Sequence, residues 1–388
     1  MLAIRGGKVL TVTQGTVDEG TVLIEDGKIK AVGRDLEVPA DAEVIDAGGK
    51  YVLPGFIDAH AHVAIWEEGH GWEGNDVNEL TDPVTPHLRA VDAINPADEG
   101  LRDALSAGVT AIWSAPGSGN VIGGQGVVVR TAGRTVEEMV VKEPAGVKAA
   151  FGENPKRVYT ERKKMPTTRM GIAAVMRTAL VKAQNYMAKL ERAGDDPEKR
   201  PERDLAMEAL VKVLRREMPL RTHAHRADDI LTALRIADEF GIDMTIEHCT
   251  EGHKIADILA EKGVKVVVGP TITARVKVEL KDRTLKTPAV LARAGVQVSL
   301  MTDHPVIPIQ YLPLIAGLAV REGMPEEEAL RAITINAADI CGVADRLGSL
   351  EAGKDADLVI YDGHPFETRS RALMTFVRGR LVYEYRGE

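Results

Sequence analysis

The chain has 388 residues, 44% hydrophobic and 28% charged, which is ordinary for a soluble globular protein of about two domains. The formal net charge of −9 argues against nucleic-acid binding, and two cysteines are too few for a disulfide framework or a cysteine-rich zinc site. No apolar run reaches the ~18 residues of a membrane span, and the N-terminus lacks signal-peptide features. We therefore expect a cytoplasmic protein without a membrane partner.

The two ends of the chain share a β-rich character. Residues 22–33 read as two strands joined by an Asp26-Gly27 turn, which is a strong hairpin signal. Residues 347–363 and 372–385 are again strand-like runs broken by glycine turns. Neither end has enough strands for a stable core alone. Together, residues 1–52 and 345–388 predict one small composite β-sandwich domain.

The middle of the chain, residues 53–344, alternates amphipathic helical patterns with short β-branched runs. Examples of such runs are GVTAIW, MTIEHC, VKVVVG and VQVSLMTD. This repetition is typical of a parallel α/β fold, and the length suits an eight-stranded (β/α)8 barrel with insertions. A doubly wound sheet would carry a glycine-rich phosphate turn after its first strand, and residues 54–62, PGFIDAHAH, contain none.

Two segments interrupt this rhythm. Residues 66–95 are polar and rich in Trp, His and Asn, and residues 154–204 contain a long Lys/Arg-rich helical pattern. Long insertions in a compact domain usually form lids or binding loops, and oligomer contacts are the alternative.

Histidines gather where predicted strands end. His60 and His62 form an HxH pair after an apolar run, and residues i and i+2 of a strand point to the same face. His223, His248 and Asp303 each close a further predicted strand. Barrel enzymes carry their chemistry at these strand ends, and imidazoles with a carboxylate are a typical hydrolytic metal set.

These motifs resemble the amidohydrolase superfamily, in its imidazolonepropionase-like and deacetylase-like branches. The likeness rests on PGFIDAHAH at 54–62, THAH at 222–225, IEH at 246–248, TDH at 302–304 and the tail LGSLEAGKDADLVIYD. The resemblance implies a divalent metal, zinc above all, with Mn, Fe or Co as alternatives. It implies the ligands His60, His62, His223, His248 and Asp303, with Asp303 also carrying the proton. A homo-oligomer is expected on the same ground.

The number of metal ions stays open. Binuclear members of the superfamily bridge two ions with a glutamate or a carboxylated lysine from a middle strand. We favour Glu153, which follows the apolar run VKAAFG, over a carboxylated Lys148 inside that run. If neither residue binds metal, the site is mononuclear and His248 orients the substrate.

The expected activity is hydrolysis of a C–N bond in a small cyclic amide or an N-acyl or peptide-like compound. His225 is expected to line the pocket, and Gln125 and Arg169 to bind substrate. A deaminase of an N-heterocycle and a deacetylase are alternatives on the same scaffold. An assembly protein without catalysis would lack ligands, and none of the five is missing.

Overall fold

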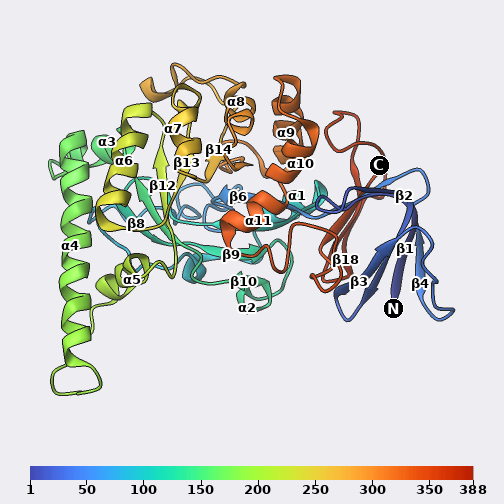
Figure 1. Ribbon diagram of the computed structural model, residues 1–388, viewed down its shortest axis with the longest axis horizontal. Coiled ribbons are helices and arrows are strands. Elements are labelled where there is room, and N and C mark those ends of the chain that lie inside the picture. Colours follow the sequence, from blue (N-terminus) through green and yellow to red (C-terminus); the bar gives the residue numbers. More distant parts are fainter. Residues whose placement is uncertain (388) are drawn as a thin grey trace.

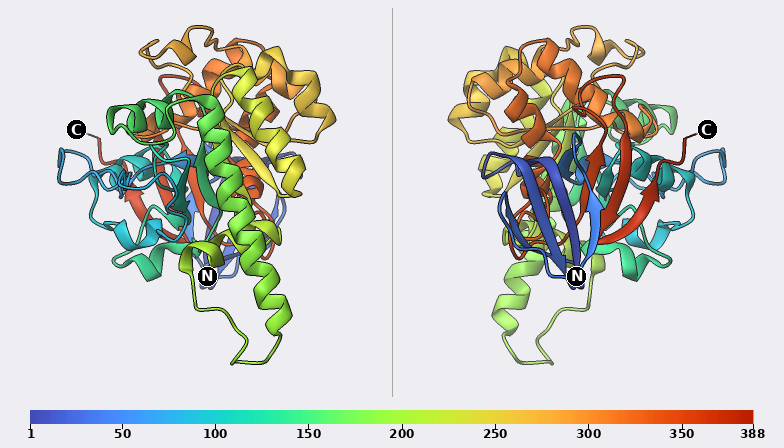
Figure 2. Two further views of the ribbon diagram at one scale, coloured as in Figure 1. Left: turned by 90° about the vertical axis from the view of Figure 1, so that its left-hand side faces the viewer. Right: turned by 90° about the vertical axis from the view of Figure 1, so that its right-hand side faces the viewer.

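The strands form three hydrogen-bonded sheets in a computed structural model that describes residues 1–387 (Figure 1). The first sheet draws its eight strands from both ends of the chain: β1 (Leu2–Leu10), β2 (Thr16–Glu25), β3 (Lys28–Gly33), β4 (Glu43–Asp46), β5 (Tyr51–Pro54), β16 (Leu358–Tyr361), β17 (Ala372–Val377) and β18 (Arg380–Glu384). The antiparallel pair β5–β16 joins the N-terminal strands to the C-terminal ones, which lie side by side in Figure 2.

The predicted Asp26-Gly27 turn connects β2 to β3. Asp26 has φ 51° and Gly27 has φ 76°, which matches the tight hairpin turn that favours these residue types. Apolar side chains from both ends of the chain, among them Ile4, Val22 and Phe376, pack into one buried cluster. The strands of the two ends therefore belong to one sheet with a shared core.

The middle of the chain provides the other two sheets. The first has the order β10-β9-β7-β6, from β6 (Phe56–Ala61), β7 (Val109–Ser114), β9 (Val127–Arg130) and β10 (Val140–Lys142). The second has the order β15-β14-β13-β12-β11-β8, from β8 (Ile122–Gln125), β11 (Val147–Ala150), β12 (Leu220–Ala224), β13 (Met244–His248), β14 (Val266–Val268) and β15 (Val298–Leu300). Strands β11 to β15 are parallel, as the helix–glycine–strand pattern predicted.

Eleven α-helices lie among these strands in residues 1–387 (Figure 1). They are α1 (Glu99–Ser106), α2 (Val136–Met139), α3 (Glu153–Glu161), α4 (Arg169–Ala193), α5 (Leu205–Leu214), α6 (Ala227–Phe240), α7 (Ala256–Glu261), α8 (Thr287–Arg293), α9 (Leu312–Arg321), α10 (Glu326–Ala332) and α11 (Ile335–Cys341). The mixed α/β class is thus confirmed. No helix of these residues is both long and apolar enough to cross a membrane.

The two central sheets are separate hydrogen-bonded ladders that meet at the carboxyl ends of β6 and β15. The N–H of His62 donates to the carbonyl of His304 at 3.0 Å, and the N–H of Asp303 donates to the carbonyl of His60 at 3.2 Å. These bonds bring the HxH segment beside the residues that follow β15. The strands of the eight-stranded barrel that the sequence predicts therefore do not form one continuous hydrogen-bonded sheet.

A buried ion pair connects the composite sheet to the central sheets. Arg130 of β9 donates through Nη2 to Asp355 at 2.6 Å and through Nε to Asp357 at 2.9 Å. Both carboxylates precede β16, and all three side chains are buried. This contact fixes the two parts of the chain against each other.

The segment 154–204 forms α3, α4 and the approach to α5. Helix α4 has 25 residues and extends beyond the body of the molecule to the loop at 194–204 (Figures 1 and 2). The predicted long helix is therefore present.

Candidate metal centre

Two adjoining clusters of possible metal ligands lie at the carboxyl ends of the central strands. The first joins His60 and His62 of the β6 segment to Asp303, which follows β15. Oδ1 of Asp303 is 3.5 Å from Nε2 of His60 and 3.3 Å from Nε2 of His62. His60 is fully buried and His62 nearly so, hence this group can enclose a cation.

The second cluster joins His223 and His225 of the β12 segment to His248, the last residue of β13. The ring centroids of His223 and His248 are 4.1 Å apart, and those of His60 and His248 are 5.2 Å apart. Since β12 and β13 are parallel neighbours, their last side chains meet at one edge of the sheet. The two clusters thus face each other.

Lys148 lies where the two clusters meet. It belongs to β11, is fully buried, and its Nζ is 3.1 Å from Nε2 of His60. Burial lowers the pKa of Lys148 to about 8, which keeps a fraction of the amine neutral near neutral pH. A neutral lysine amine is the form that takes up CO2 to become a carbamate.

Each of four imidazoles has one ring nitrogen engaged with the protein. Nδ1 of His62 contacts the carbonyl of Ala115 at 2.7 Å, and Nδ1 of His248 contacts that of Gly269 at 3.0 Å. Nδ1 of His60 lies 2.8 Å from Oε2 of Glu247, and Nδ1 of His225 lies 2.8 Å from Oγ1 of Thr250. The carbonyl and carboxylate partners accept from Nδ1–H and leave Nε2 as a lone-pair donor, whereas the Thr250 hydroxyl can pair with either tautomer of His225.

Among the cluster residues, two buried ring nitrogens lack a hydrogen-bond partner within residues 1–387: Nδ1 of His223 and Nε2 of His225. A buried polar atom without a partner is costly, and a bound cation satisfies an imidazole lone pair. The donor set of imidazoles and a carboxylate, without thiolates, suits a catalytic divalent ion. These residues therefore fit the metal that the sequence implied.

A buried carboxylate contacts the ring of His60 and orients it. Glu247 of β13 accepts from Nδ1 of His60, from Nε of Arg221 at 2.6 Å and from the hydroxyl of Thr245 at 2.8 Å. The guanidinium of Arg221 stacks over the ring of Trp113, with 3.9 Å from Cζ to the ring centroid. The sequence offered one sign of this arrangement, since Glu247 stands beside His248 in the motif IEH.

The backbone is strained at two of the candidate ligands. His248 has φ 70° and Asp303 has φ 55°, in the left-handed region that residues other than glycine seldom adopt. Such strain persists only where the surroundings impose it and is concentrated at functional sites. The carboxyl of Asp58 helps to impose it, because Asp58 binds the N–H and hydroxyl of Thr302 as well as the N–H of His60.

The protonation states of the candidate ligands at neutral pH favour metal binding. Burial lowers the pKa of His60 to about 4 and that of His225 to about 3, so both rings are neutral at pH 7. Burial raises the pKa of the Asp303 carboxyl, but the contact with His62 and the nearby His60 and Lys148 outweigh this effect. The pKa of Asp303 consequently lies below its ordinary value.

Three of the expected site residues lie elsewhere. Glu153 begins α3, and its N–H donates to Glu279 outside both clusters. The side chain of Gln125 donates to the carbonyl of Pro86 at 3.0 Å. Arg169 begins α4 and is ion-paired with Asp229 at 3.0 Å and Glu279 at 3.4 Å. None of the three belongs to either cluster of possible ligands.

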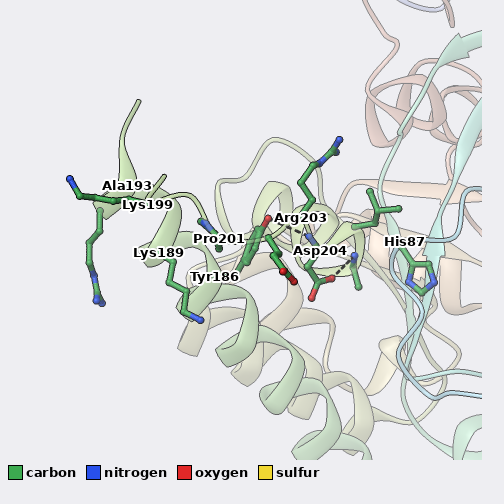
Figure 3. Close-up of a pocket in the computed structure, with 12 residues that line it drawn as sticks. His87, Tyr186, Lys189, Ala193, Lys199, Pro201, Arg203 and Asp204 are labelled. Carbon is green, nitrogen blue, oxygen red and sulfur yellow. Dashed lines mark hydrogen bonds between the residues drawn. The ribbon is translucent and has the colours of Figure 1, made fainter. Parts of the chain in front are cut away.

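A cavity of about 970 Å³ lies beside the C-terminal end of α4 (Figure 3). It is lined by His87, by Tyr186 and other residues of α4, and by Lys199 and residues 201–206. Asp204 caps α5 there, accepting from the N–H groups of Ala206 and Met207. None of the candidate metal ligands lines this cavity.

Comparison with known proteins agrees with this centre. Residues 51–382 match the Amidohydrolase family, and the chain belongs to that family. The chain is 30% identical to the amidohydrolase tasK of Hapsidospora irregularis, covering 94% of this chain but only 40% of that protein. It is 29% identical to the imidazolonepropionase of Geobacillus sp. strain WCH70, over 89% of this chain and 84% of that protein.

A solved structure is much more similar. The crystal structure of an amidohydrolase from Thermotoga maritima MSB8 has a TM-score of 0.97, with 49% identity over 99% of this chain and 100% of that one. These relationships confirm the family resemblance seen in the motifs. The protein is a hydrolase that acts on carbon–nitrogen bonds.

Proposed function

We propose that this protein is a binuclear metal-dependent amidohydrolase that cleaves a C–N bond of a small cyclic amide or an N-acyl or peptide-like substrate. The observation that carries the proposal is the position of Lys148 between the two ligand clusters. His60, His62 and Asp303 would hold one ion, and His223 and His248 the other. Lys148, carboxylated on Nζ, would bridge the two ions in place of Glu153.

The second cluster offers a third imidazole. His225 presents its Nε2 to the same space as His223 and His248. We assign His225 to the substrate side of this cluster, where its ring can donate to a developing oxyanion or complete the ligand set. Its Nδ1 contact with Thr250 keeps the ring in place for either role.

The divalent ions, when bound, would lower the pKa of a water molecule and polarise the scissile carbonyl. Asp303 then acts as the general base, because its depressed pKa leaves the carboxylate ionised at neutral pH. The same carboxyl delivers the proton to the leaving nitrogen. His62 and His60 keep Oδ1 of Asp303 in position through contacts of 3.3 and 3.5 Å.

Several finer expectations belong with this proposal. We propose zinc as the ion, with Mn, Fe or Co as alternatives, because imidazole and carboxylate ligands accept all four. We propose that the two central sheets together form one distorted (β/α)8 barrel, which comprises residues 53–344. Residues 1–52 and 345–388 then form a composite β-sandwich domain beside it. A cytoplasmic homo-oligomer is proposed on the basis of the family.

Product analysis distinguishes this proposal from the deaminase and deacetylase alternatives. The zinc-loaded protein is incubated with N-acyl amino acids, dipeptides, cyclic amides and N-heterocyclic amines. The proposal predicts an amine and a carboxylate from the amide substrates, with no ammonia. Ammonia released from a heterocyclic amine alone would favour the deaminase, and acetate released only from N-acetyl compounds would favour the deacetylase.

A further inference from the structure

Asn154, the second residue of α3, lies against the imidazole of His223. Nδ2 of Asn154 is 3.5 Å from Nε2 of His223, and Asn154 is only 9% exposed. Nδ1 of His223 is buried without a hydrogen-bond partner within residues 1–387, whereas the other four clustered imidazoles each contact the protein through Nδ1. Nδ1 is therefore the atom that His223 can offer to a cation, and Nε2 faces Asn154.

The tautomer of His223 decides which atom Asn154 must present. An imidazole that binds a cation through Nδ1 carries its proton on Nε2 and donates it to an acceptor. The oxygen and the NH2 group of a carboxamide exchange places by half a turn, without a change of shape. With Oδ1 turned toward His223, Asn154 accepts from Nε2–H. In the opposite orientation Oδ1 is buried without a partner within residues 1–387.

The hydroxyl of Ser118 holds the same side of the Asn154 carboxamide. Oγ of Ser118 is 2.7 Å from the position of Nδ2. A hydroxyl can both donate and accept, so it donates to Oδ1 when that oxygen faces His223. One oxygen of Asn154 can therefore accept from the serine and from the imidazole together.

The loop that carries Ser118 is held by the insertion at 66–95. The N–H of Gly119 donates to Oδ1 of Asn78 at 2.8 Å. A Cβ on Gly119 would lie 2.8 Å from that oxygen, and a Cβ on Gly117 would lie 2.4 Å from Nδ2 of Asn78. A side chain at either glycine would push Asn78 out of this contact. The close approach of Asn78 thus fixes the backbone on both sides of Ser118.

Helix α3 has a second attachment to the same loop. The buried hydroxyl of Tyr159 donates to Oδ1 of Asn120 at 2.6 Å. Nδ2 of Asn120 in turn donates to the carbonyl of Glu79 at 2.7 Å. The helix that carries Asn154 and the loop that carries Ser118 are therefore joined at two points, which keeps Asn154 beside His223.

We propose that Asn154, held by Ser118, is a positioning residue that accepts from Nε2–H of His223 and so keeps Nδ1 of this ring directed at the metal ion. The inference rests on the metal centre of the proposed function and adds a residue outside both clusters of possible ligands. Asn154 acts through His223 and takes no part in bond cleavage. The insertion at 66–95, through Asn78 and Ser118, thereby supports the metal centre.

Zinc affinity and the position of the ring proton test this proposal apart from turnover. Competition with a chelator measures zinc binding by wild type, Asn154→Leu, Asn154→Asp and Ser118→Ala, each shown to be folded by circular dichroism. Asn185→Leu, at an exposed asparagine of α4, is the matched control. Because the charge of Asn154→Asp can itself raise affinity, nitrogen NMR of zinc-loaded wild type with labelled histidine also locates the proton of His223, assigned with His223→Gln.

The proposal predicts that Asn154→Leu weakens zinc binding by about 10-fold to 100-fold, as for other outer groups that orient a metal-bound histidine. Ser118→Ala should weaken it by a smaller factor. Asn154→Asp, which has acceptor oxygens alone, should bind zinc at least as tightly as the wild type, and Asn185→Leu should not differ from it. The proton of His223 should lie on Nε2.

A proton on Nδ1 of His223 in the zinc-loaded wild type would overturn the proposal, whatever the variants do. Wild-type affinity in a folded Asn154→Leu, or an equal loss in Asn154→Asp, would also overturn it. If Asn154→Leu does not fold, wild-type affinity in Ser118→Ala has the same meaning. A wild type that binds no zinc would instead refute the proposed metal centre itself, and this inference with it.

Discussion

Nζ of Lys148 lies 3.1 Å from Nε2 of His60, so an amine from the middle of β11 meets the imidazole at the end of β6. Both side chains are fully buried. His60 belongs to one cluster of possible ligands, and His248 of the other cluster lies 5.2 Å away between ring centroids. A group on Lys148 Nζ can therefore touch the occupants of both clusters.

Replacing Asp303 with Asn should reduce kcat by about 100-fold to 10,000-fold, because general acid–base catalysis contributes that much. The amide cannot accept the proton from water, although it keeps the shape of the carboxyl group. Steady-state kinetics on an identified amide substrate measures this, with circular dichroism to show that the variant is folded. Activity equal to that of the wild type would contradict the role of Asp303.

Replacing Glu247 with Gln should lower the free energy of unfolding by about 3–5 kcal/mol, because Arg221 is left as an unpaired buried charge. The pair is fully buried and its N–O distance is 2.6 Å. Urea unfolding of the metal-free protein measures the change. The control is Glu239→Gln, which breaks the partly exposed pair with Arg177 and should cost less than about 1 kcal/mol.

Zinc affinity distinguishes a role of Glu247 in orienting His60 from its role in stabilising the fold. Outer groups that orient a metal-bound histidine typically change metal affinity by about 10-fold to 100-fold. Glu247→Gln should weaken zinc binding by such a factor in competition with a chelator, under conditions where the variant remains folded. Unchanged affinity would show that Glu247 supports the fold without orienting His60.

The metal-free protein should become more stable as the pH rises from about 4 to 6.5. Burial lowers the pKa of His60 to about 4 and that of His225 to about 3, whereas these rings titrate near 6.5 in the unfolded chain. The unfolded state then binds more protons in this window, so acid favours unfolding. Asp58 and Glu279, whose pKa values burial raises to about 7, act in the opposite direction, but burial also lowers the pKa values of His223 and His248 and so adds to the effect of His60 and His225.

Chemical denaturation at a series of pH values tests this slope. His225→Gln removes one of the buried imidazoles and should make the rise in stability shallower. His70→Gln, at an exposed histidine, should leave the slope as it is in the wild type. A stability that falls between pH 4 and 6.5, or a slope that His225→Gln does not alter, would refute the assignment of these neutral buried rings.

The sequence predicted the parts of this protein that depend on strand order. Parallel strands place their last residues along one edge, and the motifs therefore anticipated that His60, His62, His223, His248 and Asp303 lie together. The hairpin at Asp26-Gly27 follows from local turn chemistry. By contrast, the meeting of two separate central sheets depends on long-range strand geometry that no local pattern encodes.

The same reasoning was less informative about long side chains and their partners. Glu153 stands at the expected strand end, but Gly152 turns the chain into α3, where the backbone N–H of Glu153 donates to Glu279. Lys148 lies further back in β11 and still reaches His60 because its side chain is long. The partners of Arg169 are about 60 and 110 residues away in sequence, and only folding brings them together.

Metal content per chain tests the central claim most directly. Elemental analysis is performed on wild type, Lys148→Met and Glu153→Gln, each loaded with zinc in bicarbonate buffer and desalted. A bridge formed by Lys148 predicts about two zinc ions in the wild type and in Glu153→Gln, and one or fewer in Lys148→Met. Two ions retained in Lys148→Met, or an ion lost in Glu153→Gln alone, would contradict it.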